Sequence, residues 1–83
     1  MSTQSAETLS RRVIELAAAQ VDIPTGQISV DSQFTADLGF DSLDVVEFVM
    51  TVEEEFDIVV PEEVGDAINT VADAVQAIQK LIP

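Results

Sequence analysis

Apolar residues recur every three or four positions in three long segments of this chain, which is the spacing of one face of an α-helix. The first segment runs from about Thr3 to Gln20, and its apolar face consists of Ala6, Leu9, Val13, Leu16 and Ala17. The second runs from Ser42 to Phe56, with an apolar face of Val45, Phe48, Val49, Val52 and Phe56. The last begins at Thr70, where Thr70-Val71-Ala72-Asp73 resembles a capping box with Asp in place of the usual Glu, and it presents Val71, Ala74, Val75, Ile78, Leu81 and Ile82. Apolar stripes with acidic outer faces predict a small all-α bundle.

Two connections complete the predicted fold. Val21–Asp41 is a long loop with room for a short turn of helix near Thr25–Ile28, and five apolar residues are expected to tie it to the core: Ile23, Ile28, Val30, Phe34 and Leu38. Pro61 is well placed to begin a short helix at about Glu62–Ile68, which Gly65 weakens. We therefore predict one domain over residues 1–83, a four-helix bundle with three longer helices, a short third helix and a long loop between the first two.

Composition excludes several functions. The chain has no cysteine and no histidine, so it lacks thiolate metal ligands, the usual general base and the usual activator of a serine nucleophile. We expect a protein that is not an enzyme and has no dedicated metal site. The net charge of −13 disfavours nucleic acids and anionic membranes as partners and favours basic patches on other proteins. Without a membrane-spanning run or a targeting pattern, we expect a cytoplasmic monomer.

The residues around the start of the second predicted helix form the most informative stretch. Asp41 is a favourable N-cap, Asp44 lies where a carboxylate complements the helix dipole, and Gly39 allows a sharp turn before them. Ser42 then lies at the mouth of the helix, with its hydroxyl directed to solvent if Asp41 provides the cap. Unpaired N–H groups and the positive end of the dipole make this position favourable for a phosphate.

The second helix also carries an apolar stripe outside its core face. Leu43, Val46 and Met50 are spaced at i, i+3 and i+7, and they are bordered by Asp44, Glu47, Glu53 and Glu54. An apolar seam rimmed by acids is typical of a docking surface for a partner with a basic rim. The alternative is a helix buried on two sides of the bundle.

Asp41-Ser42-Leu43 resembles the attachment site of the acyl carrier proteins, and the resemblance covers nearly the whole chain through Asp37-Leu38-Gly39, Val52-Glu53-Glu54-Glu55-Phe56 and Val60-Pro61-Glu62-Glu63. It implies that Ser42 carries a 4′-phosphopantetheine arm, which a phosphopantetheinyl transferase adds from coenzyme A, and that the arm holds an acyl chain as a thioester. It also implies that Val60, Val64 and Gly65 contribute to the acyl pocket and to the partner surface. The interior lined by Phe48, Val49, Val64 and Ile68 is expected to shelter the acyl chain.

The resemblance leaves the pathway open. The run Glu53-Glu54-Glu55-Phe56 resembles carriers that serve separate fatty-acid synthesis enzymes, whereas Phe40 before the attachment site is common among polyketide carriers and could alter partner choice. Two other classes of function remain as alternatives: an acidic protein that binds divalent cations through residues 53–57 and 62–66, and an unmodified adaptor.

Overall fold

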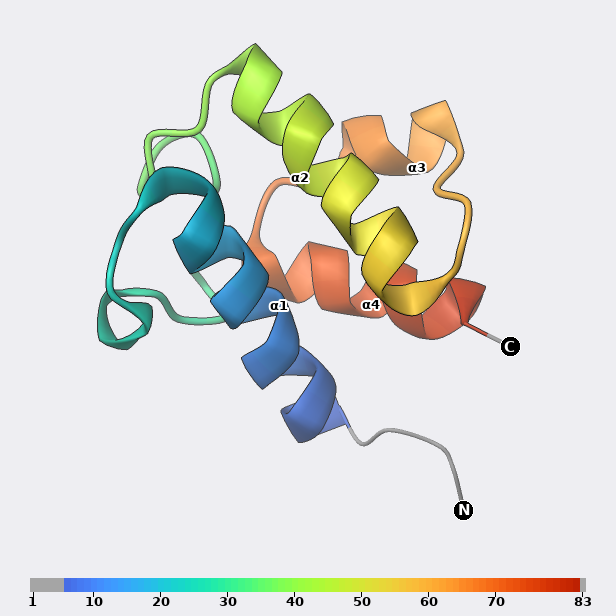
Figure 1. Ribbon diagram of the computed structural model, residues 1–83, viewed down its shortest axis with the longest axis horizontal. Coiled ribbons are helices and arrows are strands. Elements are labelled where there is room, and N and C mark those ends of the chain that lie inside the picture. The colour runs from blue at the N-terminus through green and yellow to red at the C-terminus, as the bar shows by residue number, and fades with distance from the viewer. Residues whose placement is uncertain (1–5, 83) are drawn as a thin grey trace.

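The computed structural model describes residues 6–82, which contain four α-helices, one 3-10 helix and no named strand (Figure 1). The elements in chain order are α1 (Ala6–Val21), η1 (Thr25–Gln27), α2 (Ser42–Phe56), α3 (Glu62–Ala67) and α4 (Val71–Leu81). Helix α1 packs against both α2 and α4, while the long loop between α1 and α2 covers the left-hand end in Figure 1 and α3 lies towards the right. This arrangement confirms the predicted bundle with a short third helix. The expected helix start at Thr3 and the core placement of the Ala6 side chain lie outside the described residues.

The helix boundaries differ little from those predicted. Helix α2 has the expected bounds, and the short turn of helix after α1 is present as η1. Helix α3 ends at Ala67, one residue earlier than expected, because Ile68 has extended backbone angles of φ −78° and ψ 121°. Helix α4 begins at Val71, with Thr70 as its N-cap.

The N-terminus of α4 has the expected capping box. The Thr70 side chain accepts a hydrogen bond from the Asp73 N–H at 3.1 Å, and the Asp73 carboxylate accepts from the Thr70 N–H at 3.0 Å. The same carboxylate accepts from the Asn69 N–H at 3.0 Å. These hydrogen bonds, led by the one from the Thr70 backbone, lower the pKa of Asp73 below its ordinary value, because they favour the ionised form.

A pH-dependent contribution to stability follows from the lowered pKa of Asp73. Since the pKa is lower in the folded state, the ionised carboxylate stabilises the fold above the ordinary value of 3.8, and this contribution is lost as pH falls through the folded-state pKa. We expect Asp73→Asn to be less stable than the wild type at neutral pH, with a difference that narrows in acid below pH 3.8. Urea denaturation of both proteins across this range measures the difference. A difference that stays constant with pH would contradict the prediction.

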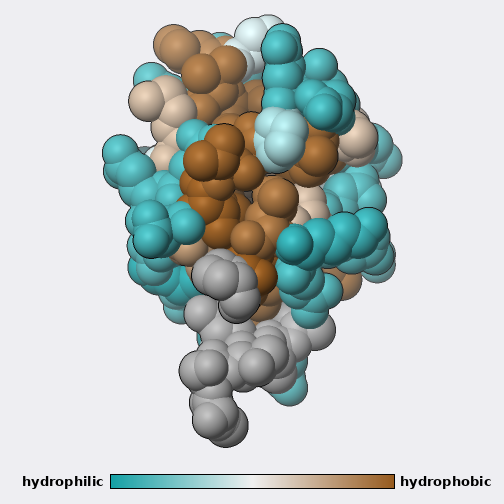
Figure 2. All heavy atoms as spheres, turned by 90° about the vertical axis from the view of Figure 1, so that its right-hand side faces the viewer, coloured by the Kyte–Doolittle hydropathy of each residue, from teal (hydrophilic) through white to brown (hydrophobic). Residues whose placement is uncertain are grey.

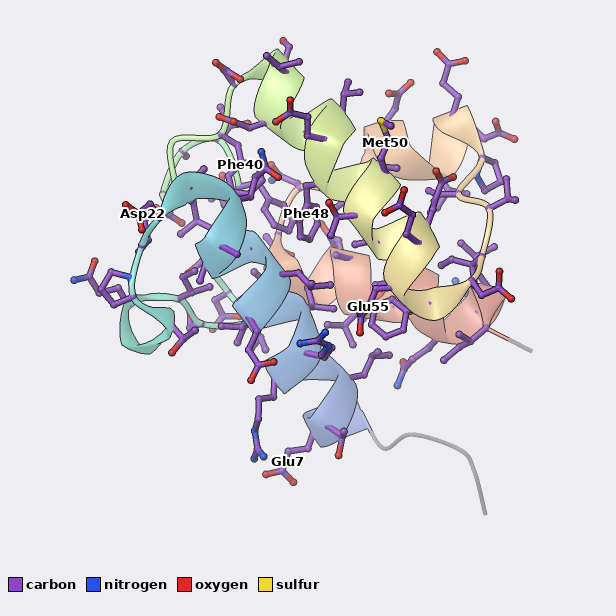
Figure 3. The ribbon with its side chains drawn as sticks, viewed as in Figure 1. Glu7, Asp22, Phe40, Phe48, Met50 and Glu55 are labelled. Atoms are coloured by element: carbon purple, nitrogen blue, oxygen red, sulfur yellow. The ribbon has the colours of Figure 1, made fainter. Side chains whose placement is uncertain are left out.

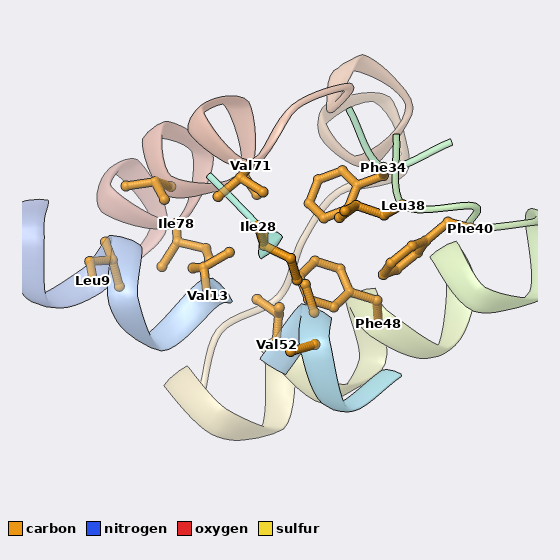
Figure 4. Close-up of a cluster of buried hydrophobic side chains, with 14 of the residues drawn as sticks. Leu9, Val13, Ile28, Phe34, Leu38, Phe40, Phe48, Val52, Val71 and Ile78 are labelled. Carbon is orange, nitrogen blue, oxygen red and sulfur yellow. The ribbon is translucent and has the colours of Figure 1, made fainter. Parts of the chain in front are cut away.

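The core is formed by the inner faces of α1, α2 and α4 together with side chains from the long loop (Figure 4). Ile28, Phe34 and Leu38 are buried and Ile23 is half-buried, as expected of loop anchors. The prediction for Val30 was wrong, because its side chain is 40% exposed. The loop is held there by its backbone instead, since the carbonyl of Val30 accepts from the Ala72 N–H at 2.9 Å. A short backbone pairing with the start of α4 thus replaces a side-chain anchor.

Two aspartates have left-handed backbone conformations immediately after helices. Asp22 follows α1 with φ 58°, and Asp57 follows α2 with φ 56°. After Asp57, the Ile58 N–H donates to the Glu53 carbonyl at 3.1 Å, which is the bond of a Schellman motif. Glycine is the favoured residue at this position, and an acidic side chain at a helix C-terminus is unfavourable towards the dipole. Asp57 is therefore a locally suboptimal residue.

Replacing Asp57 with glycine is expected to stabilise the protein by about 0.5–1 kcal/mol, because relief of backbone strain and removal of the charge outweigh the added entropy of the unfolded chain. Asp57→Asn removes the charge and keeps a side chain, so its gain should be smaller. Urea denaturation of the three proteins orders their stabilities. A glycine variant less stable than the wild type would show that the Asp57 side chain makes a favourable contribution.

Candidate functional site

The turn before α2 positions the first residues of that helix. Gly39 has φ +75°, a region that favours glycine, and the chain then turns inward so that Phe40 is only 2% exposed. The Phe40 N–H donates to the Phe34 carbonyl at 2.9 Å. The sequence analysis left open an influence of Phe40 on partner choice, because it adjoins the predicted attachment site. The ring lies inside the bundle and offers no surface for direct contact with a partner.

Asp41 provides the predicted cap of α2 and does so reciprocally with Asp44. The Asp41 carboxylate accepts from the Asp44 N–H at 2.9 Å, and the Asp44 carboxylate accepts from the Asp41 N–H at 3.1 Å. The sequence analysis predicted that Asp41 caps the helix, but for Asp44 it predicted only a favourable interaction of the charge with the helix dipole. The D-x-x-D spacing at 41–44 was the available signal, because it matches the spacing used to predict the box at Thr70 and Asp73.

Ser42 is the first residue of α2 and is exposed. Among the described residues, its hydroxyl has no hydrogen-bond partner, and the cap of the helix is provided by the Asp41 carboxylate instead. The hydroxyl therefore projects at a helix N-terminus, where backbone N–H groups and the dipole favour an anion. This environment fits a phosphodiester to phosphopantetheine. Such a linkage needs an accessible serine oxygen with open space around it for the attached arm.

The apolar stripe of α2 lies on the outside of the molecule. The exposed fraction is 63% for Leu43, 55% for Val46 and 54% for Met50. In Figure 3, Phe48 points into the interior between α2 and α4, while Met50 projects from the opposite side of α2. The alternative of a helix buried on two sides is therefore wrong.

The acids bordering this stripe fall into two groups. Glu47 and Glu54 are exposed, although the Gln20 amide of α1 donates to Glu47 at 2.8 Å. Asp44 and Glu53 are half-buried, and their carboxylates accept hydrogen bonds from backbone N–H groups of the protein itself. Asp44 caps α2, and the Glu53 carboxylate accepts from the Val60 N–H at 2.8 Å, which ties the connection before α3 to α2. Glu53 thus has a structural partner that the sequence analysis did not anticipate.

An apolar cavity of about 50 Å³ lies between α2, α3 and α4. Its lining from α2 consists of Val45, Phe48, Val49 and Val52, and its lining near α3 includes Val60, Gly65 and Ile68. Phe48, Val49 and Ile68 thus line the interior as predicted, but Val64 does not. Val64 instead lines a groove between α3 and α4, because Gly65 of α3 and Ile68 just after the helix are the residues directed towards the cavity.

The face that carries α3 and the C-terminal end of α4 is shown in Figure 2, where apolar atoms form a band between hydrophilic flanks. Val59, in the connection before α3, is 77% exposed. Within residues 6–82, no group of three acidic side chains is arranged to hold a metal ion, and no helix is both long and apolar enough to cross a bilayer.

Three comparisons with known proteins agree with this geometry. The family model described as "Phosphopantetheine attachment site" matches residues 11–78. An acyl carrier protein of Prochlorococcus marinus (strain MIT 9515) is 44% identical over 75 residues, which cover 90% of this chain and 94% of that protein. The solution structure of the apo doublet acyl carrier protein from prodigiosin biosynthesis matches 99% of this chain with a TM-score of 0.82 and 27% identity, and this chain spans 40% of that doublet. The chain therefore belongs to the acyl carrier proteins, which hold acyl groups on covalently attached 4′-phosphopantetheine.

Proposed function

We propose that Ser42 is the residue to which phosphopantetheine is attached. The observation that carries this proposal is the exposed hydroxyl of Ser42 at the start of α2, without a hydrogen-bond partner among the described residues. The Ser42 oxygen would attack the pyrophosphate of coenzyme A, forming a phosphodiester and releasing 3′,5′-ADP, while the hydroxyl proton passes to a base of the transferase. Asp41 would hold the helix terminus in place, and Leu43 would contact the transferase beside the reacting serine.

The chain supplies no base for this step. It has no histidine or cysteine, and within residues 6–82 the Ser42 hydroxyl contacts no lysine or carboxylate in a hydrogen bond. We therefore propose that the protein is a substrate and carrier in reactions that other enzymes catalyse, and that it has no catalytic activity of its own.

Incubation with coenzyme A and a broad-specificity phosphopantetheinyl transferase tests the proposal. Intact-mass spectrometry should reveal the gain of one phosphopantetheine, and fragmentation should place it on Ser42. No gain on folded protein that is not already modified would overturn the proposal, and a modification located elsewhere would overturn the assignment to Ser42.

We also propose that the outer face of α2 is where synthase enzymes and the transferase dock. Leu43, Val46 and Met50 offer an exposed apolar stripe, and Glu47 and Glu54 offer exposed charges beside it. Asp44 and Glu53 would contribute charge while keeping their structural hydrogen bonds. Val60 and Gly65 would extend the contact towards α3. The partners expected from this surface carry basic patches around an apolar centre.

Reversing the charge at Glu47 tests this surface. Glu47→Lys should lower kcat/KM for loading by the transferase about tenfold, because it places a cation against the basic rim expected on the partner. Asp31→Lys makes the same charge change at an exposed loop residue and should lower kcat/KM less than about twofold. The difference should shrink as salt is raised. Equal effects of the two variants would show that only net charge matters.

For the pathway, we propose fatty-acid synthesis, with polyketide synthesis as the second candidate. The acid-rich end of α2 at Glu53-Glu54-Glu55-Phe56 supports the first, and the Phe40 resemblance to polyketide carriers supports the second. We further propose a cytoplasmic monomer with a single domain, since coenzyme A and the partner enzymes must reach Ser42. Transfer of the malonyl-loaded carrier into reconstituted fatty-acid synthesis tests the pathway, and failure to elongate would favour the second candidate.

A further inference from the structure

Three phenylalanine rings occupy the interior beside the start of α2. The ring centroids of Phe34 and Phe40 are 5.1 Å apart, those of Phe34 and Phe48 are 5.2 Å apart, and those of Phe40 and Phe48 are 5.7 Å apart. The contacts of Phe40 with both other rings are edge-on, which is a favourable geometry for aromatic pairs. The rings form one packed cluster that contributes to the wall of the apolar cavity.

Phe40 has a special place in this cluster. The cavity runs along α2 from Val45 to Val52, a length of about 10 Å at the rise of an α-helix. Phe40 lies at the start of α2, where Figures 3 and 4 place its ring beside the beginning of the helix, two residues before Ser42. Its ring therefore fills the interior at the end of the cavity nearest the proposed attachment residue.

The position of Phe40 is also firmly fixed. Its side chain is 2% exposed, and its N–H donates to the Phe34 carbonyl at 2.9 Å. Gly39, with φ +75°, and the capping box at Asp41 hold the backbone on either side. The ring is thus held from the backbone as well as by packing, and we expect it to yield less readily than the short helix α3, which has no buried residue.

The space left beside the rings is small. One water molecule occupies a cavity volume of roughly 10–15 Å³. A cavity of about 50 Å³ therefore holds only a few groups of the size of a water molecule or a methylene. We propose that Phe40 is a specificity-determining residue, whose ring restricts the acyl group sheltered inside the bundle to short chains of roughly four carbons. This proposal rests on the proposed function, in which the acyl group is attached through Ser42.

The test compares acylated forms that differ only in chain length. Butanoyl, octanoyl and dodecanoyl forms of the wild type, Phe40→Leu and Phe40→Ala are made by incubating each unmodified protein with the corresponding acyl-coenzyme A and the transferase, which attaches the acyl-phosphopantetheine and releases 3′,5′-ADP. The measured quantity is the difference in melting temperature between the acylated and the holo form of the same variant. This difference cancels the loss of stability caused by the substitution itself, and Phe40→Leu provides a milder change if Phe40→Ala fails to fold.

Leu38→Ala is the matched control. Leu38 comes from the same loop and is 7% exposed, but it does not line the cavity. A substitution there removes buried volume from the core without enlarging the proposed acyl site. This control therefore separates a specific effect of Phe40 on the acyl site from a general loss of stability of the bundle.

In the wild type, we expect the butanoyl group to raise the melting temperature and longer chains to add nothing. In Phe40→Leu, the octanoyl form should become the most stable, with a shift of about 5 °C, while Leu38→Ala should keep the wild-type order. An unchanged order in Phe40→Leu, or the same change of order in Leu38→Ala, would overturn the proposal for Phe40. Failure to load any acyl group at Ser42 would be visible by mass and would overturn the proposed function, and with it this inference.

Discussion

Replacing Ser42 with alanine is expected to abolish the attachment of phosphopantetheine completely and to leave the fold intact. The loss should be complete because no other group can accept the arm at the start of α2. The fold should survive because Asp41, not Ser42, caps the helix, and because alanine is the most favourable residue in a helix. We expect a change in the free energy of unfolding within about 0.5 kcal/mol.

Intact mass after incubation with the transferase measures the attachment, and urea denaturation measures the stability. Ser29→Ala is the matched control, because Ser29 is an exposed serine in the loop before the site, and this variant should load fully. Phosphopantetheine found on folded Ser42→Ala would contradict the assignment. Loss of loading in both variants would point to a general defect of the preparation.

Replacing Phe48 with alanine is expected to cost about 3–5 kcal/mol of stability, the largest effect we predict for a core substitution. The side chain is 5% exposed, contacts both other rings of the aromatic cluster and lines the cavity beside it. Its removal would lose apolar burial and enlarge a void that the neighbouring rings cannot fill completely. Because a domain of this size is stabilised by only roughly 5–15 kcal/mol, the melting temperature should fall by about 15 °C or more.

Val46→Ala is the matched control for Phe48→Ala, since Val46 lies two residues earlier on the same helix but is 55% exposed. Its stability should change by less than about 0.5 kcal/mol, while its loading by the transferase should slow if the outer face of α2 docks partners. Thermal and urea denaturation give the first quantity and loading kinetics the second. A large loss of stability in Val46→Ala would mean that the outer stripe also supports the fold.

Local signals in the sequence were sufficient for much of this structure. The bounds of α2 and the cap at Thr70 depend on interactions within one or two helical turns, so residue type and spacing predict them. The outer stripe at Leu43, Val46 and Met50 was also predictable, because the acidic residues that border it favour a side of the helix that faces solvent. The proposed attachment residue depends on the same local pattern, since Asp41 and Ser42 are adjacent.

The positions of residues outside the helical periodicity could not be predicted from local patterns. Val30 and Phe40 are both apolar loop residues, yet Val30 is 40% exposed and Phe40 is 2% exposed. Their burial depends on contacts with distant segments: the backbone pairing to Ala72 for Val30, and the ring contacts to Phe34 and Phe48 for Phe40.

The same reason applies to Glu53 and Val64. The position of Glu53 in α2 predicts a surface acid, but its carboxylate accepts a hydrogen bond from the N–H of Val60, seven residues further along the chain. Val64 was predicted to line the cavity, but the orientation of α3 on the bundle places Gly65 and Ile68 there instead. Local patterns were enough to predict the helices, the N-cap residues Asp41 and Thr70 and the exposed serine, because those features depend on neighbouring residues. Packing between distant segments determined the cavity, its aromatic wall and the division of the acids between structural contacts and exposed surface.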